Sequence, residues 1–241
     1  MTDITYPNLL QATITISTLT NIRISDPDSC IFKGRYRMVW DATTTNAISN
    51  AVHAFFLLLY LIGACIHYFK KDHTFSLLIV FFFLNLLVLK VLGVYVHYYP
   101  SHLHLPPAWI AISLLVIMLN YLLVQSIQMP DLCRVIVVFL SIIFTYLFLT
   151  HDGNYTYIAL PVVLVCLIAA YYSQAKVRIG FVMVVISNLI WIVTRHIENY
   201  LTGHEIPLEY RYDNDIYHIL LILSTYVIYR GIAEGQWRHS H

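Results

Sequence analysis

Aspartate, asparagine and histidine residues cluster between positions 213 and 218, at a spacing that suits metal or acid–base chemistry. In a helix, Asp215 and Asn214 precede His218 by three and four residues, so the side chains share one face. A carboxylate one turn from an imidazole can fix its tautomer or share a metal ion with it. His97 is expected at a similar depth, and two imidazoles, a carboxylate and one open position suit catalytic zinc. We therefore predict His97, His218 and Asp215 as zinc ligands. Asp213 or Asp215 would act as a ligand or general base.

Two further apolar runs carry polar residues at helical spacing. Lys90, Gly93 and His97 follow an i, i+3, i+7 pattern and share one helix face. Arg195 and Glu198 can pair at i, i+3, and a buried ion pair of this kind would be structural. Polar groups inside a bilayer are costly, which makes them candidates for function. The additional residues predicted to line a polar cavity are His53, Lys90, Arg195, His196, Glu198 and Asn214.

Helices must bring these residues together, and the composition indicates that the helices lie in a membrane. The 241-residue chain is 59% hydrophobic and only 11% charged, whereas soluble domains are about a quarter charged. Apolar runs long enough to span a bilayer occur seven times. We expect the spans at about residues 45–69, 74–99, 108–128, 132–150, 156–174, 179–201 and 215–232. The fold class predicted is an all-α integral membrane protein, a seven-transmembrane helix bundle with a polar N-terminal segment.

The distribution of Lys and Arg predicts the orientation of this bundle. Residues 1–42 are expected to form a polar extracytoplasmic segment, 43–233 the transmembrane domain, and 234–241 a short cytoplasmic tail. Alternate loops, together with the C-terminal tail, carry seven Lys and Arg residues, while the other loops carry only Arg211. Basic residues concentrate on the cytoplasmic side. We therefore predict an extracytoplasmic N-terminus and a cytoplasmic C-terminus.

In this orientation the polar residues gather at the outer ends of the helices, and the inner halves are almost purely apolar. Such an asymmetry indicates a polar cavity that opens toward the outer leaflet. The alternative is that the Tyr and His residues lie at the headgroup level because they are amphipathic.

The chain resembles the CREST superfamily of seven-helix membrane proteins, which includes alkaline ceramidases and adiponectin/progestin receptors. The resemblance rests on the helix count, on the run Gly93-Val94-Tyr95-Val96-His97, and on the residues from Asp213 to Leu220 followed by Tyr229-Arg230-Gly231. It is closer to a less characterised bacterial-type branch with an "HND..H" pattern in the last helix. The resemblance implies zinc ligands at His97 and His218. Gly93 stands where the family has Ser, and Asn214 where it has the first His of the last helix. The replacement for the missing ligand is left open among Asp215, Asp213, His196 and His53.

The predicted function is a membrane-embedded, metal-dependent hydrolase that acts on a lipid amide or ester, as ceramidases do. Zinc would lower the pKa of its bound water to about 7 and polarise the carbonyl group. The alternative is a lipid-binding or receptor-like bundle without catalysis. A third hypothesis is an ion or proton-coupled transporter that uses Lys90, Arg195, Glu198 and Asp215 as a relay. The expected partner is membrane lipid. The net charge of +1 indicates no nucleic-acid partner, and the oligomeric state is left open.

Overall fold

A computed structural model describes residues 42–70, 75–99, 106–127, 130–151, 153–202 and 213–237, with the side chains of Glu198, Asn199 and Thr202 excepted. All of these residues belong to one compact unit, residues 40–241. Within these ranges the backbone forms helices and no strand. The predicted N-terminal segment lies outside the described residues apart from its last position.

Seven helices occur in the described ranges, and their bounds lie within four residues of the predicted spans. They are α2 (Ala42–Phe69), α3 (Leu77–Tyr98), α5 (Pro106–Ile127), α6 (Asp131–Thr150), α7 (Thr156–Tyr172), α8 (Ala175–Thr202) and α9 (Asp213–Ala233). Six of them are long and apolar enough to cross a membrane, while α7 is shorter, at 17 residues. The chain is therefore an all-helical, multi-pass membrane protein.

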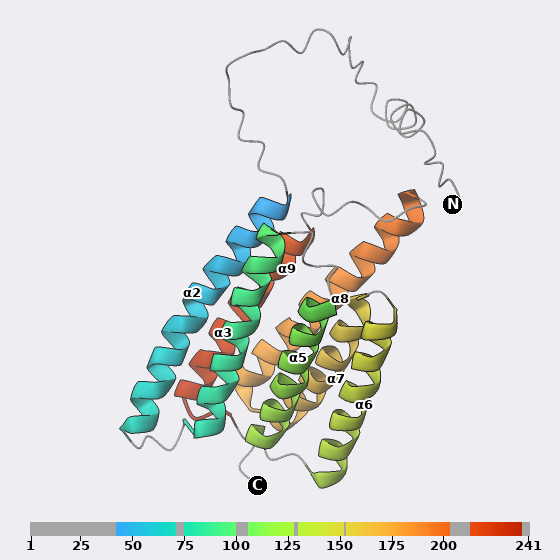
Figure 1. Ribbon diagram of the computed structural model, residues 1–241. Coiled ribbons are helices and arrows are strands. Elements are labelled where there is room, and N and C mark those ends of the chain that lie inside the picture. The colour runs from blue at the N-terminus through green and yellow to red at the C-terminus, as the bar shows by residue number, and fades with distance from the viewer. Residues whose placement is uncertain are drawn as a thin grey trace, which may run out of the picture. The chain divides into compact units, whose positions relative to one another are not determined.

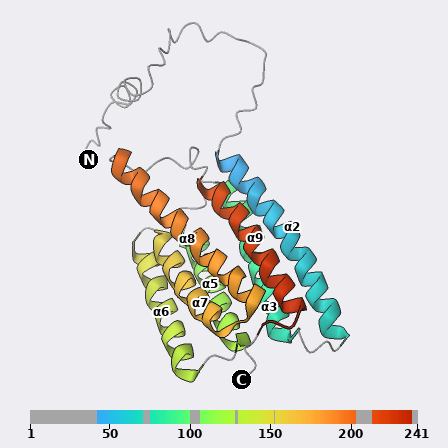
Figure 2. The ribbon, with the colours of Figure 1, turned by 180° about the vertical axis from the view of Figure 1, so that it is seen from behind.

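The order of helix packing determines which segments meet. Each helix packs against the next one along the chain, and α9 packs against both α8 and α2, so that the ring of neighbours is closed. Figure 1 shows the start of α2, the end of α3 and the start of α9 at the same end of the bundle. The view from behind in Figure 2 shows α9 between α2 and α8. This closure brings the first and last described helices side by side.

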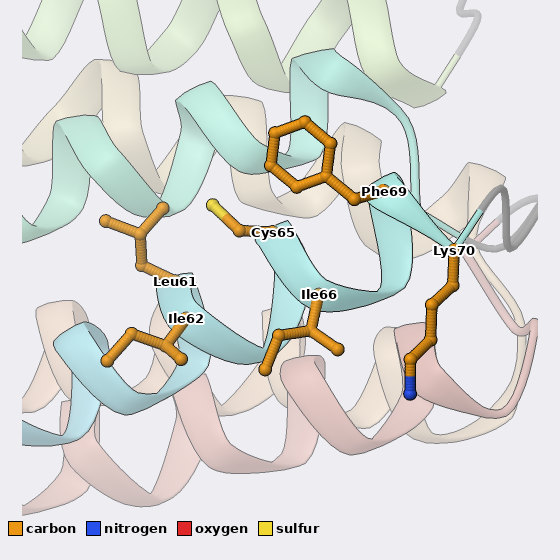
Figure 3. Close-up of a pocket in the computed structure, with 6 residues that line it drawn as sticks. All are labelled: Leu61, Ile62, Cys65, Ile66, Phe69 and Lys70. Atoms are coloured by element: carbon orange, nitrogen blue, oxygen red, sulfur yellow. The ribbon is translucent and has the colours of Figure 1, made fainter.

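Large apolar side chains point outward from the helices, as expected of a protein surrounded by lipid. Phe55, Leu114, Phe139 and Ile179 are all more than half exposed. A soluble protein rarely exposes apolar surface on this scale. Figure 3 shows one such surface, an open groove near the end of α2, with the side chains that line it. They are Leu61, Ile62, Cys65, Ile66, Phe69 and Lys70.

Aromatic and aliphatic residues fill the half of the bundle that lies away from the start of α2. Tyr60 of α2 stacks on Tyr229 of α9, with ring centroids 4.7 Å apart, and both rings contact Phe83 of α3. Phe83 and Leu57 are completely buried. The core of this half is therefore mainly apolar, and its predicted position on the cytoplasmic side stays a prediction.

The chain folds back onto the bundle directly after α9. Lys176 of α8 binds Glu234 at 2.6 Å, and its backbone N–H donates to the side chain of Gln236. The indole of Trp237 is buried and donates to the backbone oxygen of Ser126 at the end of α5. The first residues of the predicted tail therefore tie α5, α8 and α9 together.

Candidate functional site

Polar residues form a buried stripe along the first three turns of α2. Thr45, Ser49, Asn50 and His53 lie three to four residues apart or on adjacent positions, so they share one helix face. Asn50 is 2% exposed and His53 is 1% exposed. Because α2 packs between α3 and α9, this face meets the predicted site residues on both helices.

Asp215 and His218 of α9 are joined through the hydroxyl group of Ser49. The Ser49 Oγ lies 2.9 Å from Asp215 Oδ1 and 2.8 Å from His218 Nδ1. The second carboxylate oxygen of Asp215 accepts the hydroxyl of Thr45 at 2.5 Å. The structure thus brings Asp215 and His218 together as predicted, through two α2 residues that the sequence analysis did not select.

The direction of these hydrogen bonds follows from the single proton of the Ser49 hydroxyl. If Ser49 donated to His218, its oxygen lone pair would face the carboxylate of Asp215 without a proton between them. If Ser49 instead donates to Asp215, its lone pair accepts the N–H of His218 Nδ1. This arrangement leaves the lone pair of His218 on Nε2. The chain Asp215–Ser49–His218, which we call the relay, thereby selects one tautomer of a 5% exposed imidazole.

Asn50 lies on the other side of His218 and occupies space that Gly93 leaves free. Its amide donates to the backbone oxygen of Asn46 at 2.9 Å and lies 3.3 Å from both ring nitrogens of His218. A Cβ atom on Gly93 would lie only 2.7 Å from Asn50 Oδ1. Gly93 therefore lets α2 and α3 approach closely enough for Asn50 to reach the imidazole.

His97 of α3 is adjacent to His218, with ring centroids 6.1 Å apart and the ring planes at 75°. Its Nδ1 atom is buried and has no hydrogen-bond partner among the described residues. The two imidazoles predicted as zinc ligands therefore lie together. The predicted carboxylate ligand, Asp215, has both oxygens bonded to hydroxyl groups, and the described residues contain no group of three or more His, Cys, Asp or Glu placed to hold a metal ion. Zinc stays a prediction, because the described residues bring together the two imidazoles predicted as ligands without a third predicted ligand free to join them.

Lys90 lies deeper on the same face of α3 and is 8% exposed. Its Nζ lies 5.9 Å from the centre of the Tyr217 ring. The ammonium group also interacts electrostatically with His53, His97 and His218. The structure therefore brings one cation and three imidazoles together between α2, α3 and α9. We call these four residues, together with Thr45, Ser49, Asn50 and Asp215, the polar cluster.

His53 of α2, which belongs to the same cluster, lies within hydrogen-bond distance of Thr225 of α9. The Thr225 hydroxyl lies 2.9 Å from the backbone oxygen of Leu221, to which it donates its proton. The Thr225 oxygen can then accept the N–H of His53 Nε2 at 3.1 Å. His53 Nδ1 is left as a buried lone pair without a partner in the described part of the chain.

Helix α8 supports the cluster from the far side of α9. Trp191 donates its indole N–H to Asn214 at 2.6 Å, and the Tyr217 hydroxyl donates to Asn188 at 3.2 Å. The guanidinium of Arg195 lies 5.5 Å from the Trp191 ring centre. These contacts hold the first turn of α9, and with it the relay, against α8.

The remaining predicted residues are less closely connected to the cluster. His196 is exposed. The side chain of Glu198 lies outside the described residues, so its predicted pairing with Arg195 stays a prediction. Both carboxylate oxygens of Asp213 are buried without a hydrogen-bond partner in the described ranges.

The sequence analysis missed three residues of the polar cluster: Thr45, Ser49 and Asn50. Hydroxyl and amide side chains are common on helix surfaces and carry no charge, so they attract little attention singly. The signal that could have found them is their spacing with His53, because a polar stripe on an otherwise apolar span marks a face that packs on protein.

The comparisons with known proteins leave the family of this chain undetermined. No protein-family model, no curated protein and no solved structure matches it.

Proposed function

We propose that this chain is a seven-span membrane protein whose polar cluster catalyses hydrolysis of a lipid amide or ester. The observation that carries the proposal is the relay, in which Asp215 and Ser49 hold His218 with its lone pair on Nε2, 3.3 Å from the amide nitrogen of Asn50. An imidazole in this state is the usual general base of hydrolytic enzymes. The sequence resemblance to alkaline ceramidases and their relatives supports the same reaction class.

The chemistry runs through the chain's own residues. His218 Nε2 takes a proton from a water molecule as the water oxygen adds to the carbonyl carbon of the lipid. The imidazolium that forms is stabilised through Ser49 by the Asp215 carboxylate. The bond to the leaving amine or alcohol then breaks, and this group receives the proton from His218. The products are a fatty acid and an amine or alcohol.

The proposed hydrolysis has no step through zinc, because the described residues do not complete the predicted site. His97 and His218 would be two of its ligands. Metal analysis of the purified protein, before and after dialysis against a chelator, decides whether an ion is bound. One equivalent of zinc that is lost in a His97→Gln variant would support the metal prediction.

The seventh span and the orientation belong to the same proposal. Helix α7 has 17 residues, about 26 Å of helix rise, which is close to the thickness of the hydrocarbon core. The uneven distribution of Lys and Arg supports an extracytoplasmic N-terminus and a cytoplasmic C-terminus. Labelling of single cysteines placed near each terminus, in sealed cells, tests this orientation. Equal access of an impermeant reagent to both ends would contradict an odd number of spans.

Lipid hydrolysis is tested with purified protein and defined substrates. Ceramide serves as the lipid amide and a diacylglycerol as the lipid ester, and released fatty acid is quantified by mass spectrometry. We expect turnover by the wild type and a loss of about 100-fold or more in His218→Gln and Ser49→Ala. His196→Gln is the matched control, because it removes an exposed imidazole from α8. Turnover that survives both relay variants would refute the proposed base. Tight lipid binding without turnover would instead favour the non-catalytic alternative.

A further inference from the structure

Lys90 is a buried cation for which the described residues provide no carboxylate. The ion pairs within the described ranges join Arg134 to Asp131, and Lys176 and Arg230 to Glu234, all near the opposite end of the bundle. Lys90 itself is 8% exposed. Taking an ammonium group out of water is costly unless a partner compensates it.

The groups that surround Lys90 offer only partial compensation. The Tyr217 ring, 5.9 Å from Nζ, attracts the ammonium through its negative face. The three neighbouring imidazoles supply no negative charge. Neither Asp215, which is bonded to hydroxyl groups of α2, nor Asp213 lies within ion-pair distance of Lys90. The ammonium therefore has N–H donors that the described side chains leave without an acceptor.

Lys90 also shares two neighbours with the relay, His97 and Tyr217. His97 follows it by two turns on the same face of α3 and contacts the ring of His218. Tyr217, whose ring lies next to Lys90, directly precedes His218 on α9. A molecule held near His218 Nε2 could thus place a second group against Lys90.

We propose that Lys90 binds an anionic oxygen group, a carboxylate or a phosphate, of a lipid in the polar cluster. This inference rests on the proposed function when it assigns the group to substrate or product, since hydrolysis releases a fatty acid carboxylate. The binding itself does not depend on turnover. A free anion from water has the same chemistry as the lipid group, and the test separates the two sources.

Binding is measured with molecules that the enzyme cannot hydrolyse. Dodecanoate and a short-chain, ether-linked phosphatidic acid are the anionic lipids, and dodecanol and the matching ether-linked glycerol are their neutral counterparts. Acetate and inorganic phosphate test a free anion. Each is titrated into the purified protein in detergent, and the affinity is taken from thermal unfolding followed by tryptophan fluorescence. We expect the anionic lipids to bind about 10- to 100-fold more tightly than the neutral ones, and more tightly than acetate or phosphate.

Four variants test the role of the charge. Lys90→Met keeps the approximate length without the charge and should abolish the preference for anionic lipids, while Lys90→Arg should retain part of it. His196→Gln is the matched control, because it removes an exposed polar side chain from α8 and should leave the preference unchanged. Asp213→Asn removes a buried carboxylate and should not reduce the preference. If Lys90→Met does not fold, the wild type and Lys90→Arg still carry the test.

Several results would overturn the inference. The first is a wild type that binds charged and neutral lipids equally well, and the second is an undiminished preference in Lys90→Met. A third is mutual compensation: Lys90→Met and Asp213→Asn would each destabilise the protein, and the double variant would recover its stability. A preference for anionic lipids without any hydrolysis would contradict only the proposed function and would still support the anion site.

Discussion

The contact between Gly93 and Asn50 can be tested by adding one methyl group. In Gly93→Ala, the new Cβ would lie 2.7 Å from Asn50 Oδ1 and 3.1 Å from its Cγ. Ordinary contact begins at 3.4 Å, so Asn50 must withdraw by about 0.7 Å (3.4 minus 2.7). The amide cannot withdraw freely, because it donates to the backbone oxygen of Asn46 and contacts His218.

Two opposing free energies determine the outcome of Gly93→Ala. Overpacking of a close interface costs about 1–3 kcal/mol, and the disturbed hydrogen bond of a buried amide lies in the same range. Replacing a glycine inside a helix by alanine stabilises the helix by up to about 1 kcal/mol. We therefore expect Gly93→Ala to destabilise the wild type by about 0–2 kcal/mol. In an Asn50→Ala background, where the clash is absent, the same change should stabilise the protein by up to about 1 kcal/mol.

A double-mutant cycle measures this change of sign directly. Wild type, Gly93→Ala, Asn50→Ala and the double variant are unfolded reversibly in mixed detergent micelles, and unfolding is followed by circular dichroism. The expected coupling energy is about 1–3 kcal/mol, within the range found for residues in contact. Additive effects of the two substitutions would refute the reasoning, because they would mean that Asn50 does not fill the space beside Gly93.

Three further predictions concern the end of the bundle where α9 ends and the α8–α9 contact. The hydrogen bond from Lys176 lowers the pKa of Glu234, so the contact between them is kept at neutral pH and lost as acid protonates the carboxylate of the folded protein. Tryptophan fluorescence should report the loss of this contact, and Lys176→Gln should shift the transition to higher pH. Trp237→Ala should cost about 3–5 kcal/mol of unfolding free energy, and Trp237→Phe should cost less because it keeps an aromatic ring while it loses the bond to Ser126 and part of the buried volume. Gly180→Ala places a Cβ 2.5 Å from an isoleucine of α9 and should cost about 1–3 kcal/mol, whereas an unchanged stability would mean that α8 and α9 are not in such close contact.

The helices could be predicted from the sequence because their signal is long and redundant. Each span is an apolar run of about 20 residues, ended by charges, Pro or Gly, and a few substitutions would not hide it. Pairing of α2 with α9 is different, since it depends on closure of the ring across more than 160 residues. No local pattern of residues specifies that closure.

The candidate site was predictable to the extent that it contains charged or ionisable residues. His97, Asp215 and His218 could be selected from one sequence because imidazole and carboxylate groups are rare inside membranes. Their hydrogen bonds could not be predicted, because the partners Ser49 and Thr45 belong to residue types found on most helices. Asp215, predicted as a zinc ligand, has both carboxylate oxygens bonded to these hydroxyls.

The packing of α9 against α2 has a consequence for biosynthesis. Of the described helices, the ribosome makes α2 first and α9 last, so the buried stripe of α2 enters the bilayer before its partners exist. Until the five intervening described helices and α9 are inserted, Asn50 and His53 carry polar atoms that lipid cannot satisfy. We expect nascent chains that stop before residue 213 to be recognised by quality-control proteases or membrane chaperones, and the finished chain to escape them when its last helix docks.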